Sequence, residues 1–143
     1  MAISNAVCNS FKQELLVGTH NFTASSGNTF KLALYTSSAT LGASTTAFTT
    51  SQEASGTNYT SGGNALTSVT PALASSTAVC DFADLTFGTA TLSGVRGALI
   101  YNSSASNKAV CSLDFGADKS STAGNFTVVF PSPTATGAII RLA

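Results

Sequence analysis

The chain has 143 residues, of which only 12 are charged, whereas serine and threonine together supply 42. Six cationic side chains balance six acidic ones, and both kinds are scattered along the sequence. This length predicts one folded domain over residues 1–143. Because there is no basic stripe to neutralise phosphates, we expect neither a nucleic-acid partner nor an anionic membrane. So little charge suits a permanent assembly better than a freely diffusing monomer.

The N-terminal segment is the only convincing helix in the sequence, and we expect it over about residues 4–17. Apolar side chains recur there every four residues, which places them on one face of a helix. Ser4 or Asn5 is expected to cap its start, and Gly18 to end it. The stripe either packs on the protein's own sheet or docks on a neighbouring subunit. Its residues are Ile3, Val7, Phe11 and Leu15.

From His20 onward the apolar period changes from four to two, which predicts strands. About eight short strands follow, separated by turns rich in glycine, asparagine and serine. This pattern, without interleaved helices, predicts a mainly β fold: an antiparallel β-sandwich or jelly roll with one N-terminal α-helix. The expected strands lie at Phe30–Tyr35, Leu66–Val69, Ala78–Phe82, Leu85–Phe87, Val95–Tyr101, Val110–Phe115, Phe126–Phe130 and Ala138–Leu142.

The stretch of about residues 37–59 has poor periodicity, and we expect it to be a long loop or projecting arm. Long loops in compact domains are usually functional or bound to something. Glu53 is the only charged residue between Lys31 and Asp81, so this neutral stretch is a candidate for subunit contact. Its candidate contact residues are Leu41, Phe48 and Tyr59.

The chain is poor in residues that carry out chemistry. His20 is the only histidine, so no histidine pair can hold a metal, and any Ser-His-acid triad must use it. The G-x-S-x-G elbow and the phosphate-binding loops are absent. We therefore expect His20 to be a strand-end residue satisfied by hydrogen bonds. We expect no catalytic residue, no cofactor and no resident metal, and hence no enzyme.

Two smaller groups of residues leave alternatives open. Asp81 and Asp84 are weak candidates for a hard cation, and Asp84 is equally suited to a turn between two strands. Cys8, Cys80 and Cys111 match neither a disulfide framework nor a zinc site, so we expect small buried side chains. A disulfide between Cys80 and Cys111 remains an alternative if their strands are neighbours.

Targeting signals are also missing from the sequence. The N-terminus lacks the basic segment and apolar run of a secretory signal, and no stretch approaches the length needed to span a membrane. We expect the protein to be made in a cytoplasm, and used there or assembled there into something that leaves.

Several phrases in the first half of the chain resemble small structural proteins of tailed bacteriophages. These phrases are FKQELL (11–16) with Gly18-x-His20-x-Phe22, FKLALYT (30–36), ATLG (39–42) with TTAF (45–48), and SGTNY (55–59) before Gly62-Gly63. The second half adds only its β-pattern and the ending AIIRL (138–142). The resemblance carries no catalytic signature.

Some phage capsids carry jelly-roll cement proteins of this size, and the resemblance implies a role of that kind. It implies a non-enzymatic cement or decoration protein that binds the major capsid protein on the outside of the shell and stabilises it. Such a protein is assembled in the host bacterial cytoplasm and is commonly a dimer or trimer. A tail or adsorption component, with a carbohydrate-binding face, is the alternative.

Overall fold

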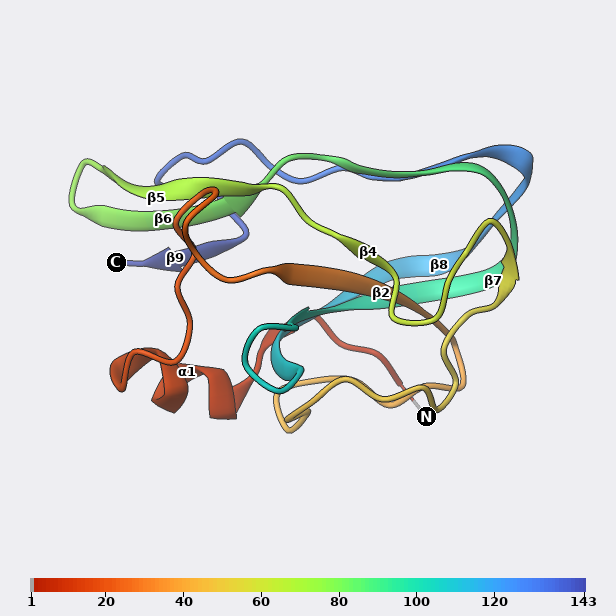
Figure 1. The fold of residues 1–143 in the computed structure, drawn as a ribbon, viewed down its shortest axis with the longest axis horizontal. Helices are drawn as coiled ribbons and strands as arrows, with labels where there is room; N and C mark the ends of the chain where they lie inside the picture. The colour runs from red at the N-terminus through yellow and green to blue at the C-terminus, as the bar shows by residue number, and fades with distance from the viewer. Residues whose placement is uncertain (1) are drawn as a thin grey trace.

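A computed structural model describes residues 2–143 and shows a mainly β protein with antiparallel sheets and one short helix (Figure 1). This confirms the predicted fold class, although the strand order does not establish a jelly roll. No helix among residues 2–143 is long and apolar enough to cross a membrane.

The larger sheet has the strand order β1-β8-β7-β2-β4. The short strand β3 also pairs with β7, at Thr91 and Leu92, just before the part of β7 that pairs with β2. The central strand of this sheet is β7, and the register of β2 against β7 pairs Phe30 with Asn102 and Leu34 with Ala98. Both faces of β2 are covered, so Leu32, Ala33 and Leu34 are all fully buried. The strands are β1 (Ala6–Val7), β2 (Phe30–Thr36), β3 (Gly56–Thr57), β4 (Asn64–Ala65), β7 (Leu85–Asn102) and β8 (Lys108–Val128).

A smaller sheet, with the order β5-β6-β9, faces the larger one. Its strands are β5 (Ser68–Ala74), β6 (Thr77–Phe82) and β9 (Ile140–Leu142). Aromatic rings join the layers: Phe82 of β6 lies 5.9 Å from both Phe30 of β2 and Phe130, measured between ring centroids. Phe22 stacks on Phe30 at 4.2 Å. One continuous core therefore lies between the two sheets.

The β7–β8 ribbon is the longest element, and it belongs to both layers. In Figure 1 it runs through the lower layer, turns at one end of the molecule and returns along the top. At the bend, Val95 pairs with Lys119 and Gly97 with Asp114, so Arg96 alone faces a four-residue bulge, 115–118. Bulges of this kind let a strand change direction.

Arg96 fixes this bulge at both ends. Its Nε donates to Asp114 Oδ1 at 3.1 Å, and its Nη1 lies 3.5 Å from Asp118 Oδ1. The Gly116 N–H also donates to Asp114, and this bond, followed by the guanidinium, lowers the pKa of Asp114. The sequence shows these residues as isolated charges; in the fold they define the corner of the ribbon.

The strand predictions were right in position but wrong in number at this ribbon. The expected strands Leu85–Phe87 and Val95–Tyr101 are parts of β7, and Val110–Phe115 and Phe126–Phe130 fall largely within β8. The intervening glycines and hydroxyl residues look like turns, but they form register shifts within continuous strands. Glycine inside a strand often marks such a bulge.

The N-terminal helix is shorter than predicted: α1 spans Asn9–Leu16 rather than 4–17. The chain before it is extended, because β-branched Val7 pairs in β1 with Cys111, and the Ser4 N–H donates to the Leu41 carbonyl. The predicted caps Ser4 and Asn5 were therefore wrong. Gly18 does end the helix, with a positive φ of 77°.

The prediction of a projecting arm at about 37–59 was also wrong. The segment has little regular structure, as expected, but it lies along the larger sheet (Figure 1). Backbone hydrogen bonds fix it along its length, including Ala54 to Leu34, Phe48 to Asn107 and Ala109 to Thr46. Unpaired backbone groups against a sheet are costly, and these bonds satisfy them.

Gly63 provides a test of the packing at β4. Its φ is +70°, and a Cβ there would overlap the Leu32 carbonyl oxygen. Gly63→Ala should lower the free energy of unfolding by about 2 kcal/mol or more in urea titrations, because strain and overlap add.

The matched control is Gly88→Ala, where the nearest heavy atom to the new Cβ is Asn125 Oδ1 at 3.9 Å. The control should change stability by less than about 1 kcal/mol. Equal losses in both variants would contradict this description of the turn before β4.

Candidate functional site

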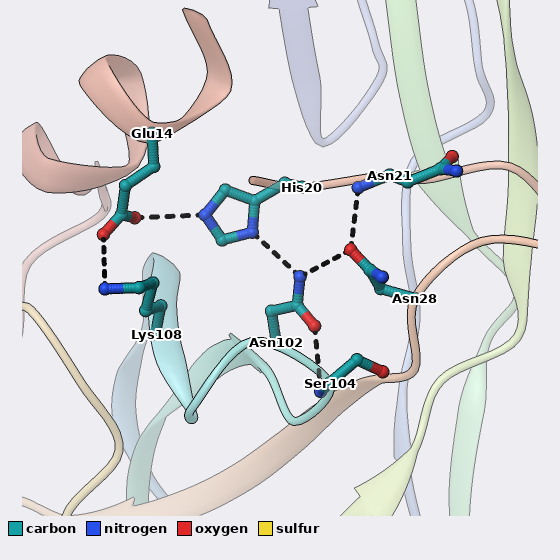
Figure 2. Close-up of polar contacts among 7 residues, drawn as sticks. All are labelled: Glu14, His20, Asn21, Asn28, Asn102, Ser104 and Lys108. Carbon is teal, nitrogen blue, oxygen red and sulfur yellow. Dashed lines mark hydrogen bonds and ion pairs between the residues drawn. The ribbon is translucent and has the colours of Figure 1, made fainter. Parts of the chain in front are cut away.

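A cluster of polar side chains is buried between α1, the loop that follows it and the β7–β8 turn (Figure 2). His20 is at its centre, with its side chain fully buried. Its Nε2 lies 3.0 Å from Glu14 Oε1, and its Nδ1 lies 3.0 Å from Asn102 Nδ2. Lys108 Nζ approaches the other Glu14 oxygen at 3.4 Å. The cluster is the natural first candidate for a site.

Local structure brings Glu14 and His20 together. The chain reverses at Gly18, and the Thr19 N–H donates to the Glu14 carbonyl at 3.0 Å. The His20 ring then packs against Phe11, with ring centroids 4.9 Å apart. Asn102 is the last residue of β7, so the cluster links the helix to the main sheet.

Backbone donors determine which nitrogen of His20 carries the proton. The Asn21 N–H donates to Asn28 Oδ1, so that oxygen must receive an N–H from Asn102. The Ser104 N–H donates to Asn102 Oδ1, which fixes the same amide orientation. Asn102 therefore donates to Nδ1 of His20, and the ring carries its proton on Nε2, which donates to Glu14.

This arrangement leaves His20 no free nitrogen for a substrate. A general base needs a ring nitrogen within reach of the proton that it removes. Here both nitrogens are bound within the protein and the side chain is fully buried. The cluster connects three segments of the fold, and it presents no reactive atom at the surface.

His20 was expected at the end of a strand, but it lies in the loop between α1 and β2; its predicted hydrogen-bond satisfaction is confirmed. Sequence reasoning missed Glu14 because it lies off the apolar stripe, although only 9% of it is exposed. It also missed Asn102, which is completely buried. The available signal was a lone histidine six residues beyond a glutamate, across a helix-ending glycine.

Glu53 organises a second polar cluster at the end of the segment 37–59. Its carboxylate accepts hydrogen bonds from the Tyr59 hydroxyl at 2.8 Å, the Ser61 hydroxyl at 2.6 Å and the Gly62 N–H at 2.7 Å. The Tyr101 hydroxyl donates to the Gly62 carbonyl at 2.7 Å. The one charge in this neutral stretch thus stabilises a turn.

The predicted contact residues lie mostly inside the protein. Ile3, Phe11 and Leu41 are buried in its own core, so they do not form an exposed docking surface. Val7 pairs in β1, and the other three are partly buried against the core: Leu15, Phe48 and Tyr59. A variant lacking residues 1–17 would lose side chains of the core. Loss of partner binding in such a variant would therefore not show whether the helix docks on a partner or the fold has failed.

The two aspartates considered for a cation serve the backbone. Asp84 Oδ1 accepts the Phe130 N–H at 2.8 Å, and Asp81 Oδ1 accepts the Phe82 N–H at 2.8 Å. No group of three or more metal-ligating side chains occurs among residues 2–143. Burial raises the pKa of Asp81, so this residue's contribution to stability falls as pH rises from the ordinary aspartate pKa through the raised one.

The three cysteines are free and buried, which confirms the expectation of small buried side chains; no Cys80–Cys111 disulfide forms. Burial raises the pKa of the Cys8 thiol to about 11 and that of Cys80 to about 12, and it also raises the pKa of Cys111. The thiolate is the reactive form, so all three are inert at neutral pH.

No protein-family model, curated protein sequence or solved structure matches the chain.

The assignment of the histidine cluster predicts the effect of Asn102→Asp. The new carboxylate would face the Asn28 oxygen without a proton to donate, so the free energy of unfolding at neutral pH should fall by about 2 kcal/mol. Asn107→Asp, at an exposed position in the same turn, is the control and should change stability by less than about 0.5 kcal/mol.

The proton position on His20 can be measured directly in the wild-type protein. The ¹⁵N chemical shifts of the His20 ring should show an unprotonated Nδ1. A protonated Nδ1 would contradict the assignment.

Thiol labelling tests the cysteines. At pH 7, a water-soluble disulfide reagent should leave the native protein unlabelled, because no thiol is exposed or ionised. The reaction time should be one in which the reagent labels a small-molecule thiol completely. After denaturation without a reductant, mass spectrometry should show all three cysteines labelled. Labelling of only one would reveal a disulfide and contradict the structure.

Proposed function

We propose that the protein is a non-enzymatic structural component of a tailed-phage virion, a cement or decoration protein that binds the major capsid protein on the outside of the shell. The observation that carries the proposal is a wide hydroxyl-rich surface without charge. Residues 85–95 and 120–128, which form the returning arm of the ribbon, contain no charged side chain, and neither do residues 129–140, which follow it. The exposed hydroxyls of this arm are Thr86, Thr89, Thr91, Ser93, Ser120, Thr122 and Thr127.

Such a surface suits a permanent contact with another protein. Burying a charge is costly unless it is paired, whereas a hydroxyl can both donate and accept hydrogen bonds. The groups also support one another: the Thr86 and Thr127 hydroxyls lie 3.0 Å apart across the ribbon. On a symmetric shell, many modest contacts of this kind add to a strong total attachment.

The polar clusters of the interior support the non-enzymatic part of the proposal. His20, Glu14 and Glu53 are used in hydrogen bonds that hold the fold together. The charged residues at the ribbon corner fix a bulge. None of these groups converges on an open cleft with a free reactive atom.

The alternative, a tail or adsorption component that binds carbohydrate, receives no comparable support. Sugar sites generally use exposed aromatic rings for stacking. All twelve aromatic residues are buried or half-buried. The hydroxyls of Tyr35, Tyr59 and Tyr101 all donate to groups within the protein.

The test uses capsids of the encoding phage from which this protein has been removed. Purified protein added to these shells should co-sediment to a saturating stoichiometry and raise the temperature at which the shells disrupt. Absence of binding by the wild-type protein would overturn the proposal. Saturation at a few copies located on the tail would favour the alternative.

Two matched variants locate the contact. Thr86→Lys places a charge on the hydroxyl surface, and it should weaken binding by about tenfold or more because an unpaired charge would be buried. Gln13→Lys adds the same charge on the exposed side of α1 and should bind normally. Equal binding by both variants would exclude the ribbon as the contact surface.

A further inference from the structure

The outer edge of β8 is a strand edge without a partner. β7 pairs with β8 along its length, whereas β1 pairs on the other side only at Cys111 and Ser112. Further along, the Asp114 and Gly116 N–H groups donate to side-chain oxygens. Between Asn125 and Val128, no side chain among residues 2–143 caps the outward backbone.

The other sheet edges are blunted by devices that prevent edge-to-edge pairing. β5 has Pro71 in its middle and a register shift between Val69 and Ala72. The strands β4 and β9 have only two and three residues. Proline, bulges and short length all discourage the addition of another strand.

A register shift lies opposite Asn125, and beyond it the chain continues from Phe126 to Phe130 without a proline. The segment Asn125–Phe130, NFTVVF, has no charge, no proline and a high β-propensity. Its inner side chains Phe126, Val128 and Phe130 are buried in the core, and Val129 is 73% exposed. An exposed, uncharged edge of this type is an aggregation hazard unless it is covered.

A groove runs beside this edge. Its volume is about 380 Å³, and it lies between Phe115 and Lys119 on one side and Asn125–Val129 on the other. Phe115, which projects from the bulge, lies 6.4 Å from Phe126 between ring centroids. The groove therefore offers apolar surface next to open backbone donors and acceptors.

An extended strand is the ligand that such an edge fits, and the edge is itself an extended strand. A second copy, turned by a two-fold axis perpendicular to the sheet, would run antiparallel to the first. In a pairing centred on Thr127, this threonine faces its own copy and Val129 faces Asn125. All the pairs are neutral, so no charge repulsion opposes the contact, and opposed threonines are a favourable pair.

We propose that the end of β8 together with the next residue, Asn125–Val129, joins two copies of this chain into a two-fold dimer with a continuous sheet. This inference goes beyond the proposed function and does not depend on it, because a dimer would form in solution without any shell. The dimer leaves the outward face of the ribbon available on both copies.

The test compares the wild-type protein with two lysine variants by sedimentation velocity over a range of concentrations. The wild type should sediment as a dimer. The double variant Thr127→Lys/Val129→Lys should weaken dimerisation by about tenfold or more, because four charges would crowd one edge. Leu73→Lys, on the blunted β5 strand and 75% exposed, is the control and should remain dimeric.

Hydrogen exchange of the wild-type protein gives a second readout that needs no variant. Amides of Asn125–Val129 should become more protected as the concentration rises, whereas amides of β5 should not. A wild type that stays monomeric throughout would overturn the inference. So would a dimer that Leu73→Lys dissociates and the double variant does not.

Discussion

The bend in the β7–β8 ribbon is the constraint on which the rest of the structure depends. Because one pair of strands contributes to both layers, the aromatic core can form only if the ribbon turns at the right place. The turn is a bulge opposite Arg96, whose guanidinium reaches Asp114 and Asp118. The smaller sheet then closes over the core, and Phe82 meets Phe30 between the layers.

The buried polar groups extend this scaffold to the irregular parts of the chain. His20, with Glu14 and Asn102, joins the helix to the end of β7 (Figure 2). Glu53 does the same for the segment 37–59. Several of the few charges in the chain thus stabilise the fold, and the returning arm of the ribbon is left to neutral hydroxyls. Composition shows that charges are few, but only the structure shows that many of them lie in these clusters and none lies on the returning arm.

How far the sequence predicted this structure depends on the range of the interactions. Apolar residues located β2 and β6 well, although burial in these strands is nearly continuous and does not alternate, because β2 is covered on both faces. They did not show that β7 and β8 are continuous, because bulged strands rich in glycine and threonine resemble turns. Period four from Ile3 to Leu15 suggested one long helix, but Ile3 and Val7 pair with distant segments. The Glu14–Asn102 cluster depends on long-range contacts that no local pattern reveals.

The ribbon presents a neutral hydroxyl face, and most buried polar side chains beneath it are hydrogen-bonded, with Ser10 Oγ and Asp81 Oδ2 as exceptions. We propose that through this face the protein occupies regular positions on the outside of a phage shell. The most direct measurement is an electron cryomicroscopy map of the intact particle. We expect density of this fold repeated over the shell lattice, with the hydroxyl face of β7 and β8 against the major capsid protein. Shell density without this fold, or its presence only on the tail, would contradict it.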